Sequence, residues 1–483
     1  MKLFTKTRTL LQTLALALLA AGVVSAQDAG LPPLGPTTPE TPATPAPVKA
    51  GQETAESVNA FAFDLYREVI KGKDNVLFSP YSIASALGMT YAGADGETKE
   101  QMKRVLHFGD DVHGGFGVLN RALIPPVPRC GPPSSITPTF PIGGMADALN
   151  SDEATTPASA PKSSGKPSPE KPQPLKPKPS DKPGCDAEGH DPILRVANRL
   201  WPQEGFAIKP EFKAIAGKSY GAPITPLDFR ADAEAAKDTI NRWVAQKTTN
   251  RDGEPMIPEL LEALSPETKL VLTNAIYFAG EWESQFDEDQ TRDGAFFLAD
   301  GSMVTTPMMN TDAATVRLSF DPESSARIVE IPYRGGDMSL VVAYGQDLSE
   351  IESKLTPANL EVALKNAREM KDHPLSMPKF KVESEFQLKD ALEALGMVDL
   401  FSEADADLSG IAEAQGLHVS KVVHKAAASF DEKGAEAAAA TAVVVVLESA
   451  MIGTRLDQPF LYMIRHTKSG TILFMGRMVD PTK

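Results

Sequence analysis

Residues 217–221, Gly-Lys-Ser-Tyr-Gly, match the G-x-S-x-G pattern in which many hydrolases hold a nucleophilic serine. That chemistry needs Ser219 on a sharp turn between a strand and a helix, where its hydroxyl is exposed. The preceding residues, 210–216, have a helical pattern and not a strand pattern. The context is wrong for a nucleophile, so we expect no hydrolytic site here.

Two further patterns look like metal sites and are better explained without a metal. Residues 289–300 loosely match a calcium-binding loop, but a threonine and an aspartate stand at two ligand positions, and residues 296–297 favour a strand. His107 and His113 lack metal-ligand spacing, and we expect both on the surface. The sequence therefore predicts no metal, no cofactor and no catalytic residue, and we expect that the protein is not an enzyme.

Residues 424–453 hold the most informative pattern of the chain. A strand-like segment ends at the turn Glu432-Lys433-Gly434, and small residues follow from Ala435 to Thr441. Alanine is a poor strand former, so this stretch need not lie in a sheet at first, yet no proline or bulky side chain prevents it from doing so. Residues 443–446 are four valines and favour extended structure. The pattern predicts an exposed loop that can become a strand.

Irregularly alternating helices and strands surround this segment, which is typical of one large α+β domain. The apolar spacing predicts helices over residues 57–70, 82–91, 98–108, 232–248, 259–264 and 387–395, the last capped by Gly396. Strands are predicted over residues 269–278 and, with a turn between two strands, over 327–342.

Several ordered motifs resemble those of the serpins, the serine protease inhibitor family. They lie at residues 75–83, 197–201, 272–278 with Trp282, 377–380, 434–441 and 457–466. The resemblance covers about residues 53–123 and 192–481. It implies the serpin fold, in which three β-sheets are surrounded by about eight or nine helices and a reactive-centre loop is exposed.

The resemblance also implies a mechanism. A target serine endopeptidase, or a cysteine endopeptidase as a second class, cleaves the loop and forms an acyl-enzyme. The loop then inserts into the main sheet and distorts the protease before deacylation, so the inhibitor is a suicide substrate whose native form is kinetically trapped. The alternative is a non-inhibitory serpin that acts as a binding, chaperone or surface protein. Such members typically carry unfavourable hinge residues, which this chain lacks.

The hinge and the reactive bond follow from the same resemblance. Strand alternation would bury every second residue from Ala435 onward and leave Glu436 facing water. The family's usual spacing from the hinge glycine places the reactive bond at Glu448–Ser449, with Leu447 as the alternative residue before the cut. The hinge set implied by the family is Glu432, Gly434, Ala435, Ala437, Ala438, Ala439, Ala440 and Thr441.

Two further groups match family positions that control sheet opening. Ser79, Ser82, Asn274 and His424 match a hydrogen-bonded cluster beneath the main sheet, called the shutter. Trp282 and Lys379 match the breach, where the loop first enters, and the resemblance implies an ion pair between Lys379 and Glu432.

The ends and one interruption of the chain have other compositions. Residues 1–26 have a basic start, a short apolar stretch and the small-residue site Val-Ser-Ala, as in a secretory signal peptide. Residues 27–50 read as a Pro/Thr-rich linker, and residues 51–483 as the serpin domain. A Pro/Lys-rich insertion at 124–191, with 16 of the chain's 40 prolines, interrupts that domain.

These features predict a protein secreted to the periplasm or the medium, without a transmembrane segment and monomeric. Cys130 and Cys185, near the ends of the insertion, are expected to pair in that oxidising compartment. The formal charge of −16 argues against nucleic acid as a partner. The expected partner is a target serine protease. The lysines of residues 161–183 make an anionic surface a second candidate partner, although a solvated spacer explains them more simply.

Overall fold

The computed structural model describes residues 47–72, 74–123, 192–222, 224–250, 253–413, 416–435 and 453–483. The predicted signal peptide, nearly all of the predicted linker and the whole Pro/Lys-rich insertion lie outside these residues. So do Cys130, Cys185, Ala437, Ala438, Ala439, Ala440, Thr441, Leu447, Glu448 and Ser449.

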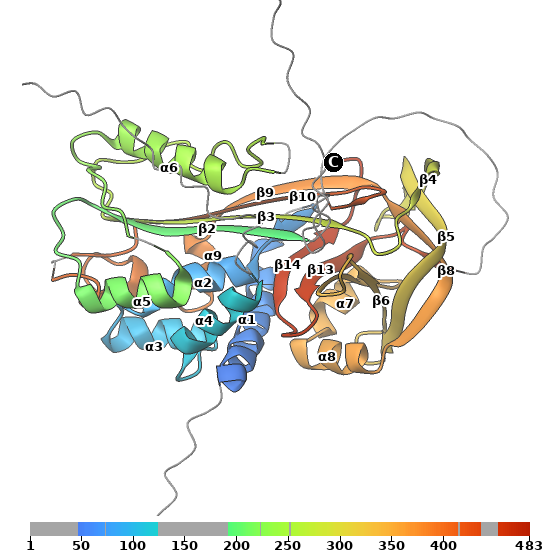
Figure 1. Ribbon diagram of the computed structural model, residues 1–483, viewed down its shortest axis with the longest axis horizontal. Helices are drawn as coiled ribbons and strands as arrows, with labels where there is room; N and C mark the ends of the chain where they lie inside the picture. The colour runs from blue at the N-terminus through green and yellow to red at the C-terminus, as the bar shows by residue number, and fades with distance from the viewer. Residues whose placement is uncertain are drawn as a thin grey trace, which may run out of the picture. The chain divides into compact units, whose positions relative to one another are not determined.

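The described residues form helices and strands in an irregular order (Figure 1). The helices are α1 (Pro47–Val69), α2 (Pro80–Tyr91), α3 (Gly96–Val105), α4 (Val112–Leu123), α5 (Pro210–Tyr220), α6 (Ala233–Lys247), α7 (Leu348–Lys354), α8 (Pro357–Lys365) and α9 (Lys389–Ala394), with a short 3-10 helix at Asp399–Phe401. The strands are β1 (Val76–Phe78), β2 (Ile193–Pro202), β3 (Leu270–Glu281), β4 (Asp287–Phe297), β5 (Met303–Asp321), β6 (Ala326–Pro332), β7 (Met338–Tyr344), β8 (Arg368–Pro378), β9 (Phe380–Gln387), β10 (Lys421–Phe430), β11 (Gly434–Ala435), β12 (Thr454–Arg455), β13 (Phe460–His466) and β14 (Ile472–Met478).

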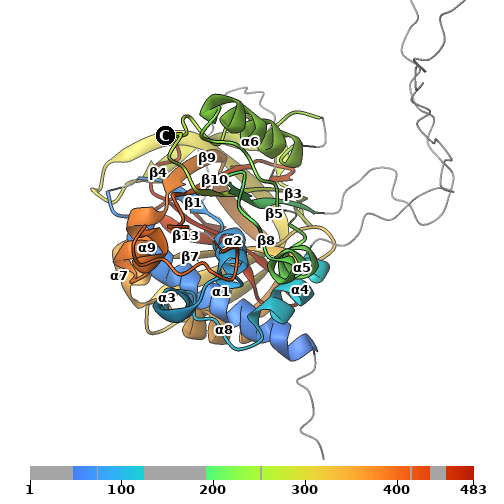
Figure 2. The ribbon, with the colours of Figure 1, turned by 90° about the vertical axis from the view of Figure 1, so that its left-hand side faces the viewer.

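A five-stranded sheet with the order β2-β3-β11-β10-β9 carries the predicted site. Both of its faces are covered (Figures 1 and 2). Helix α6 packs on one face through a cluster that includes Trp201, Ile240 and Val271. Helices α1 and α2 and strand β14 lie under the other face, within the main core. Double coverage explains why β3 is mostly apolar and is buried along almost all of its length, with Thr273 and Asn274 as polar exceptions.

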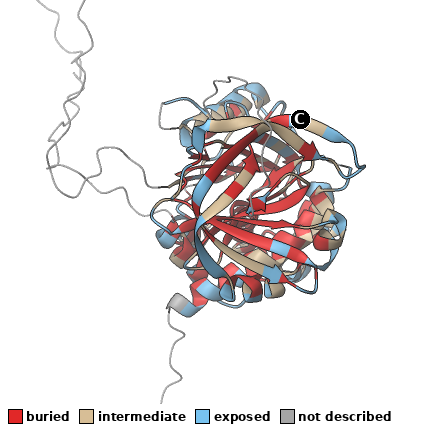
Figure 3. Cartoon of the chain, turned by 90° about the vertical axis from the view of Figure 1, so that its right-hand side faces the viewer, coloured by how far each residue is buried: buried red, intermediate tan, exposed pale blue. Residues whose placement is uncertain are grey.

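The second sheet has nine strands. Their order is β1-β14-β13-β7-β6-β5-β8-β12, and β4 pairs with β5 beside this path. Its β7, β13 and β14 are buried almost throughout, as Figure 3 shows in red. The long β5 pairs with β4 at its start and with β6 at its end, and β8 pairs along both parts. Because β5 belongs to both parts, the described residues form two hydrogen-bonded sheets where three were expected.

The α+β fold class is confirmed, and several predicted boundaries change. Helix α1 starts at Pro47, ten residues before the predicted helix and inside the predicted linker. The helix predicted over 259–264 is wrong, because the described residues 253–269 form an extended cover over the sheet without helical hydrogen bonds. Asn241 of α6 holds this cover by accepting from the backbone N–H groups of Leu260 and Leu261. The described part of the chain contains no helix that is long and apolar enough to cross a bilayer.

Candidate functional site

A buried hydrogen-bonded cluster joins the centre of the five-stranded sheet to the start of α2. His424 on β10 lies directly opposite Asn274 on β3, and its Nδ1 contacts the Asn274 Oδ1. The Asn274 amide donates to the Ser82 Oγ at 2.8 Å, and the Ser79 N–H donates to the His424 Nε2 at 3.0 Å. All four predicted shutter residues are therefore brought together, and all are fully buried.

The cluster fixes the charge state of His424. Since Nε2 accepts from a backbone N–H, the ring proton lies on Nδ1 and is donated to Asn274, so the imidazole is neutral. Burial lowers the pKa of His424 to about 3. A neutral, satisfied ring contributes to stability, and separating β3 from β10 must break its bond to Asn274.

Asn198 belongs to the same cluster and was not among the predicted site residues. Its side chain accepts from Asn274 at 2.9 Å and from Ser82 at 2.9 Å, and it donates to the Ser82 carbonyl at 2.9 Å. It stands opposite Asn274 in the β2–β3 register. The sequence signal that could have indicated Asn198 is an uncharged amide within the largely apolar segment 196–202.

The line along which β3 and β10 pair, which we call the seam, closes directly above this cluster. The two strands run parallel from Lys421 opposite Val271 to Ala427 opposite Tyr277. Beyond this point they part, and β11 lies between them. Gly434 pairs with Glu281, while Ala435 pairs with Gly280 on one side and with Phe430 on the other. The first two residues of the predicted loop therefore already form a short wedge between the strands.

The wedge fits only small residues. A Cβ built on Gly434 would lie 1.9 Å from the carbonyl oxygen of Gly280, and Ala435 is 1 % exposed. The sequence pattern treated Ala435 as part of the exposed loop. The structure places it in the sheet because two neighbouring strands offer their edges to it.

Trp282 closes the seam at its open end. Its indole is fully buried and stacks on Tyr333 with ring centroids 4.6 Å apart. The indole N–H donates to the Asp431 carbonyl at 2.9 Å, and the backbone N–H donates to the Lys433 carbonyl at 2.8 Å. The tryptophan thus holds the turn that precedes the wedge.

An ion pair holds the same turn from the other side. The Lys379 Nζ lies 2.8 Å from one carboxylate oxygen of Glu432, and the Thr291 hydroxyl donates to the other at 2.8 Å. Burial acts to raise the pKa of Glu432, but the hydrogen bonds from Lys379 and Thr291 outweigh it and lower that pKa. The expected pairing of Glu432 with Lys379 is therefore present.

The far end of the loop returns to the other sheet. Thr454 and Arg455 form β12, which pairs in parallel with β8 at Leu375 and Ser376. Residues 436–452 thus connect the wedge in one sheet with the end strand of the other. Backbone pairing fixes Ala435 on one side of this segment and Thr454, two residues beyond it, on the other.

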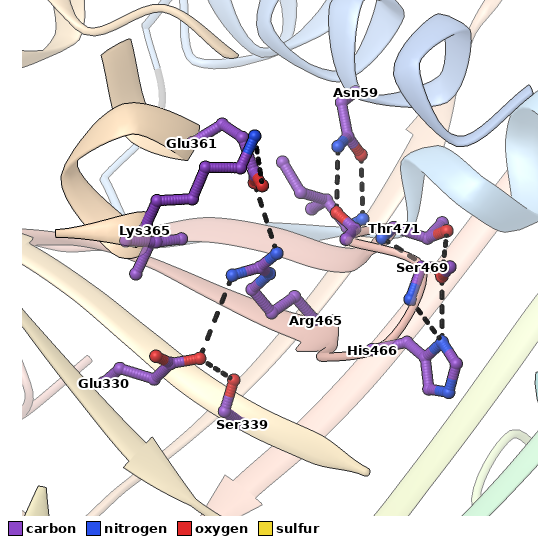
Figure 4. Close-up of polar contacts among 12 residues, drawn as sticks. Asn59, Glu330, Ser339, Glu361, Lys365, Arg465, His466, Ser469 and Thr471 are labelled. Atoms are coloured by element: carbon purple, nitrogen blue, oxygen red, sulfur yellow. Dashed lines mark hydrogen bonds and ion pairs between the residues drawn. The ribbon is translucent and has the colours of Figure 1, made fainter. Parts of the chain in front are cut away.

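A second buried polar cluster lies away from the seam, between α8 and β13 (Figure 4). The Arg465 guanidinium lies 3.3 Å from Glu361 on α8 and 3.9 Å from Glu330 on β6, and the Ser339 hydroxyl donates to Glu330 at 2.8 Å. Asn59 of α1 donates to the Gly470 carbonyl at 2.9 Å. These contacts join α1, α8 and the nine-stranded sheet, and we assign them a structural role.

Of the rejected motifs, two behave as expected and one does not. Ser219 lies within α5, so it has no nucleophile geometry. Residues 287–297 form β4. His107 is exposed as expected, but His113 is only partly exposed, because it packs against Tyr91 and contacts the Tyr220 hydroxyl at 2.7 Å. Burial and, to a lesser extent, Lys99 lower its pKa to about 4.

Comparisons with known proteins agree with this geometry. A family model described as serpin (serine protease inhibitor) matches residues 56–127 and 177–481. An uncharacterized serpin-like protein of Thermococcus kodakarensis is 32% identical over 447 residues, covering 90% of this chain and 88% of the relative. The leukocyte elastase inhibitor of Bos taurus is 32% identical over 438 residues, covering 87% and 97%. Among solved structures, uncleaved ovalbumin matches with a TM-score of 0.67 and 25% identity, covering 89% of this chain and 100% of ovalbumin.

Proposed function

Because this chain belongs to the serpin family, we propose that it is a suicide-substrate inhibitor of serine endopeptidases, with cysteine endopeptidases as a second class of target. The observation that carries the proposal is the wedge. Gly434 and Ala435 already pair with β3 and β10 at the point where these strands part. A loop that has begun to enter a sheet needs only to continue the same pairing.

The register supports continued insertion. Ala435 faces Gly280 and Phe430, so counting antiparallel along both strands would place Thr441 opposite Asn274 and His424. Its hydroxyl would then meet the two groups whose mutual hydrogen bond had been broken. The existing pairing of β3 with β10 agrees with this count, because His424 already stands opposite Asn274 in the closed sheet. The inserted strand can therefore satisfy both neighbours without a register slip.

The target protease supplies the catalytic groups, and this chain supplies the loop whose insertion traps the acyl-enzyme. The protease nucleophile attacks the carbonyl carbon of Glu448, the bond to the Ser449 nitrogen breaks, and that nitrogen leaves with a proton as a new amino terminus. Glu448 stays bound to the protease as an ester. Insertion of residues 436–448 then moves the esterified protease before water can hydrolyse the bond.

Incubation with a panel of proteases tests the proposal. We expect an SDS-stable complex with a glutamyl endopeptidase and release of a C-terminal peptide that begins at Ser449. A peptide that begins at Glu448 would move the reactive bond to Leu447 and favour a chymotrypsin- or subtilisin-like target. Cleavage by every protease without a stable complex would support the alternative, a non-inhibitory binding, chaperone or surface protein.

Substitution of the bait residue sharpens this test. Glu448→Arg should move complex formation from the glutamyl endopeptidase to trypsin-like enzymes, because their primary pocket accepts a basic side chain. Arg455 serves as an internal control, since cleavage after it would yield a peptide that begins at Leu456. Unchanged target preference in the variant would overturn the assignment of Glu448.

We also propose that the protein acts outside the cytoplasm, on the evidence of residues 1–26 alone. The measurement is the amino terminus of the protein recovered from periplasm or medium. We expect it to begin at Gln27. An intact Met1 on the active protein would contradict export through this signal.

A further inference from the structure

An open pocket of about 520 Å³ lies at the end of the seam opposite to the wedge. One wall consists of residues 263–265 and 267–268, which come just before β3, and the opposite wall of residues 418–421, which lead into β10. Phe401 and Lys389 complete it. The pocket is therefore the place where a strand that filled the seam would emerge.

The charged groups of this pocket favour a carboxylate. Lys389, Lys421 and His418 line it from different segments, and Glu267 is the acidic residue among its lining. The Lys389 Nζ lies 5.8 Å from the centre of the Phe401 ring, and the Lys421 Nζ donates to the Ala263 carbonyl at 2.9 Å. A lysine over an aromatic ring, beside a second lysine, offers both an apolar surface and positive charge.

The register of the wedge brings one acidic residue of this chain to the pocket. Continuing the pairing of Ala435 with Gly280 to Leu270, the last residue of β3 in this direction, would place Val445 opposite it, and Glu448, three residues further on, would reach the turn that contains Glu267. The same count would place Val444 opposite Lys421, and alternation would put Glu448 on the same face of the sheet as Val444. That face carries Lys421 and the cover segment that it contacts.

We propose that this pocket is an anchor for residues 446–448 of the inserted loop, with the carboxylate of Glu448 bound by Lys389 and Lys421. The inference rests on the proposed function, because the pocket is filled only after insertion. It gives Glu448 a second role, since the side chain that selects the protease would also fasten the inserted strand at its end. The side-chain carboxylate stays available while the main-chain carbonyl is esterified.

A double-mutant cycle on the cleaved protein tests this anchor. Thermolysin, a metalloprotease that forms no acyl-enzyme, is used to cut the loop between Ser449 and Arg455, and mass spectrometry confirms that Glu448 stays on the large fragment. Lys389→Glu and Glu448→Lys should each lower the guanidinium midpoint of the cleaved form. The double variant should recover most of the loss, because the charges are exchanged. In the uncleaved protein the two substitutions should be additive.

The control is Lys371→Glu, an equal charge reversal on an exposed lysine of β8, which should not couple to Glu448. A cleaved form no more stable than the native form would overturn the proposed insertion itself. A cleaved form that is more stable, with additive effects of Lys389→Glu and Glu448→Lys, would leave insertion intact and overturn the anchor. Coupling already present in the uncleaved protein would also overturn it, since the pocket would then be filled before insertion.

Discussion

At the scale of single residues, the function proposed for this chain depends on buried polar side chains that carry no charge. His424, Asn274, Asn198 and Ser82 satisfy one another beneath the seam, so the closed sheet is stable although it is built to open. The bond between His424 and Asn274 joins the two strands of the seam, so it must be broken or replaced when a strand enters between them. The cluster therefore sets part of the barrier to insertion.

The first prediction concerns the pH dependence of stability. Burial lowers the pKa of His424 to about 3, whereas the unfolded histidine titrates near about 6.5. Between these values the unfolded state binds a proton that the native state does not, so stability is complete above about pH 6.5 and falls as the pH decreases. We expect His424 to contribute a loss of roughly 1 kcal/mol per pH unit in this window.

Urea unfolding at pH 7.5, 6 and 5 measures this loss. His113 titrates in the same direction, so the comparison is between wild type and His424→Gln, which retains His113. The variant should be less stable at pH 7.5 and should show a shallower pH dependence. Equal slopes for the two proteins would show that the pKa of His424 is the same in the native and unfolded states, and would contradict its burial as a neutral group.

The second prediction concerns the wedge. Ala435→Arg should convert the protein from an inhibitor to a substrate, because a guanidinium would enter a site that is 1 % exposed and has no acidic partner among the groups that pair with it. Insertion slows while hydrolysis of the acyl-enzyme does not. The measurement is the number of inhibitor molecules consumed per protease trapped, with Ala435→Ser as the small-residue control. Wild-type stoichiometry in the arginine variant would remove Ala435 from the insertion path.

At the scale of elements, the sequence predicted the long regular segments well and the contacts between them poorly. Periodicity placed β3 to within three residues at its end, because a strand buried on both faces is mostly apolar. It misread residues 259–264 as helical because their apolar spacing serves to cover the sheet next to α6. The seam between β3 and β10 could not be read from either strand, since it depends on pairing between distant segments. Ser79, Ser82, Asn274 and His424 were identified through the family resemblance, whereas Asn198 was not predicted.

The third prediction tests how the elements around the breach are joined. Lys379→Met should lower the free energy of unfolding by about 1–3 kcal/mol, because Glu432 would be left buried with the Thr291 hydroxyl as its remaining side-chain donor. Lys381→Met, two residues further along the chain in β9, is the matched control. Its partner Glu383 is half exposed, so this change should cost less than about 1 kcal/mol. Equal losses in the two variants would argue against a special role for the buried pair.

At the scale of the whole molecule, the insertion over residues 124–191 joins α4 to β2, and β2 pairs with β3 beside the open end of the seam. Ile193, close to the end of the insertion, stands opposite Ala279, one residue from the partner of Ala435. A surface or molecule that bound the insertion would therefore be connected to the chain close to the breach. The composition of residues 161–183 suits either a solvated spacer or a tether to an anionic surface. Retention of the protein on an anionic matrix distinguishes them. A tether requires salt-sensitive retention that is lost in a variant lacking residues 131–184, whereas a spacer predicts the same retention for both proteins.

The fourth prediction is that Cys130 and Cys185 form a disulfide in the exported protein. Both lie outside the described residues, so the prediction rests on their position near the ends of the insertion and on the compartment. Closing a loop of about 55 residues contributes up to about 4 kcal/mol in the chain-entropy model. Titration of the denatured, unreduced protein should find no free thiol, and two free thiols would refute the pairing.

The order in which strands pair along the chain has a consequence for how the protein folds. Strands β1 and β14 pair although they lie at opposite ends of the described chain, and β3 pairs with β10 across a long separation. Such distant pairings form late, whereas Phe430 and Ala435 meet through a local turn. Pulse-labelling hydrogen exchange should therefore find the Asp431 amide, which donates to the Gly434 carbonyl across this turn, protected before those of β10 that face β3. Under the proposed function, this order of pairing, and not the lowest free energy, would select the uninserted state, so that each newly folded molecule would retain the free energy of insertion for use against one protease.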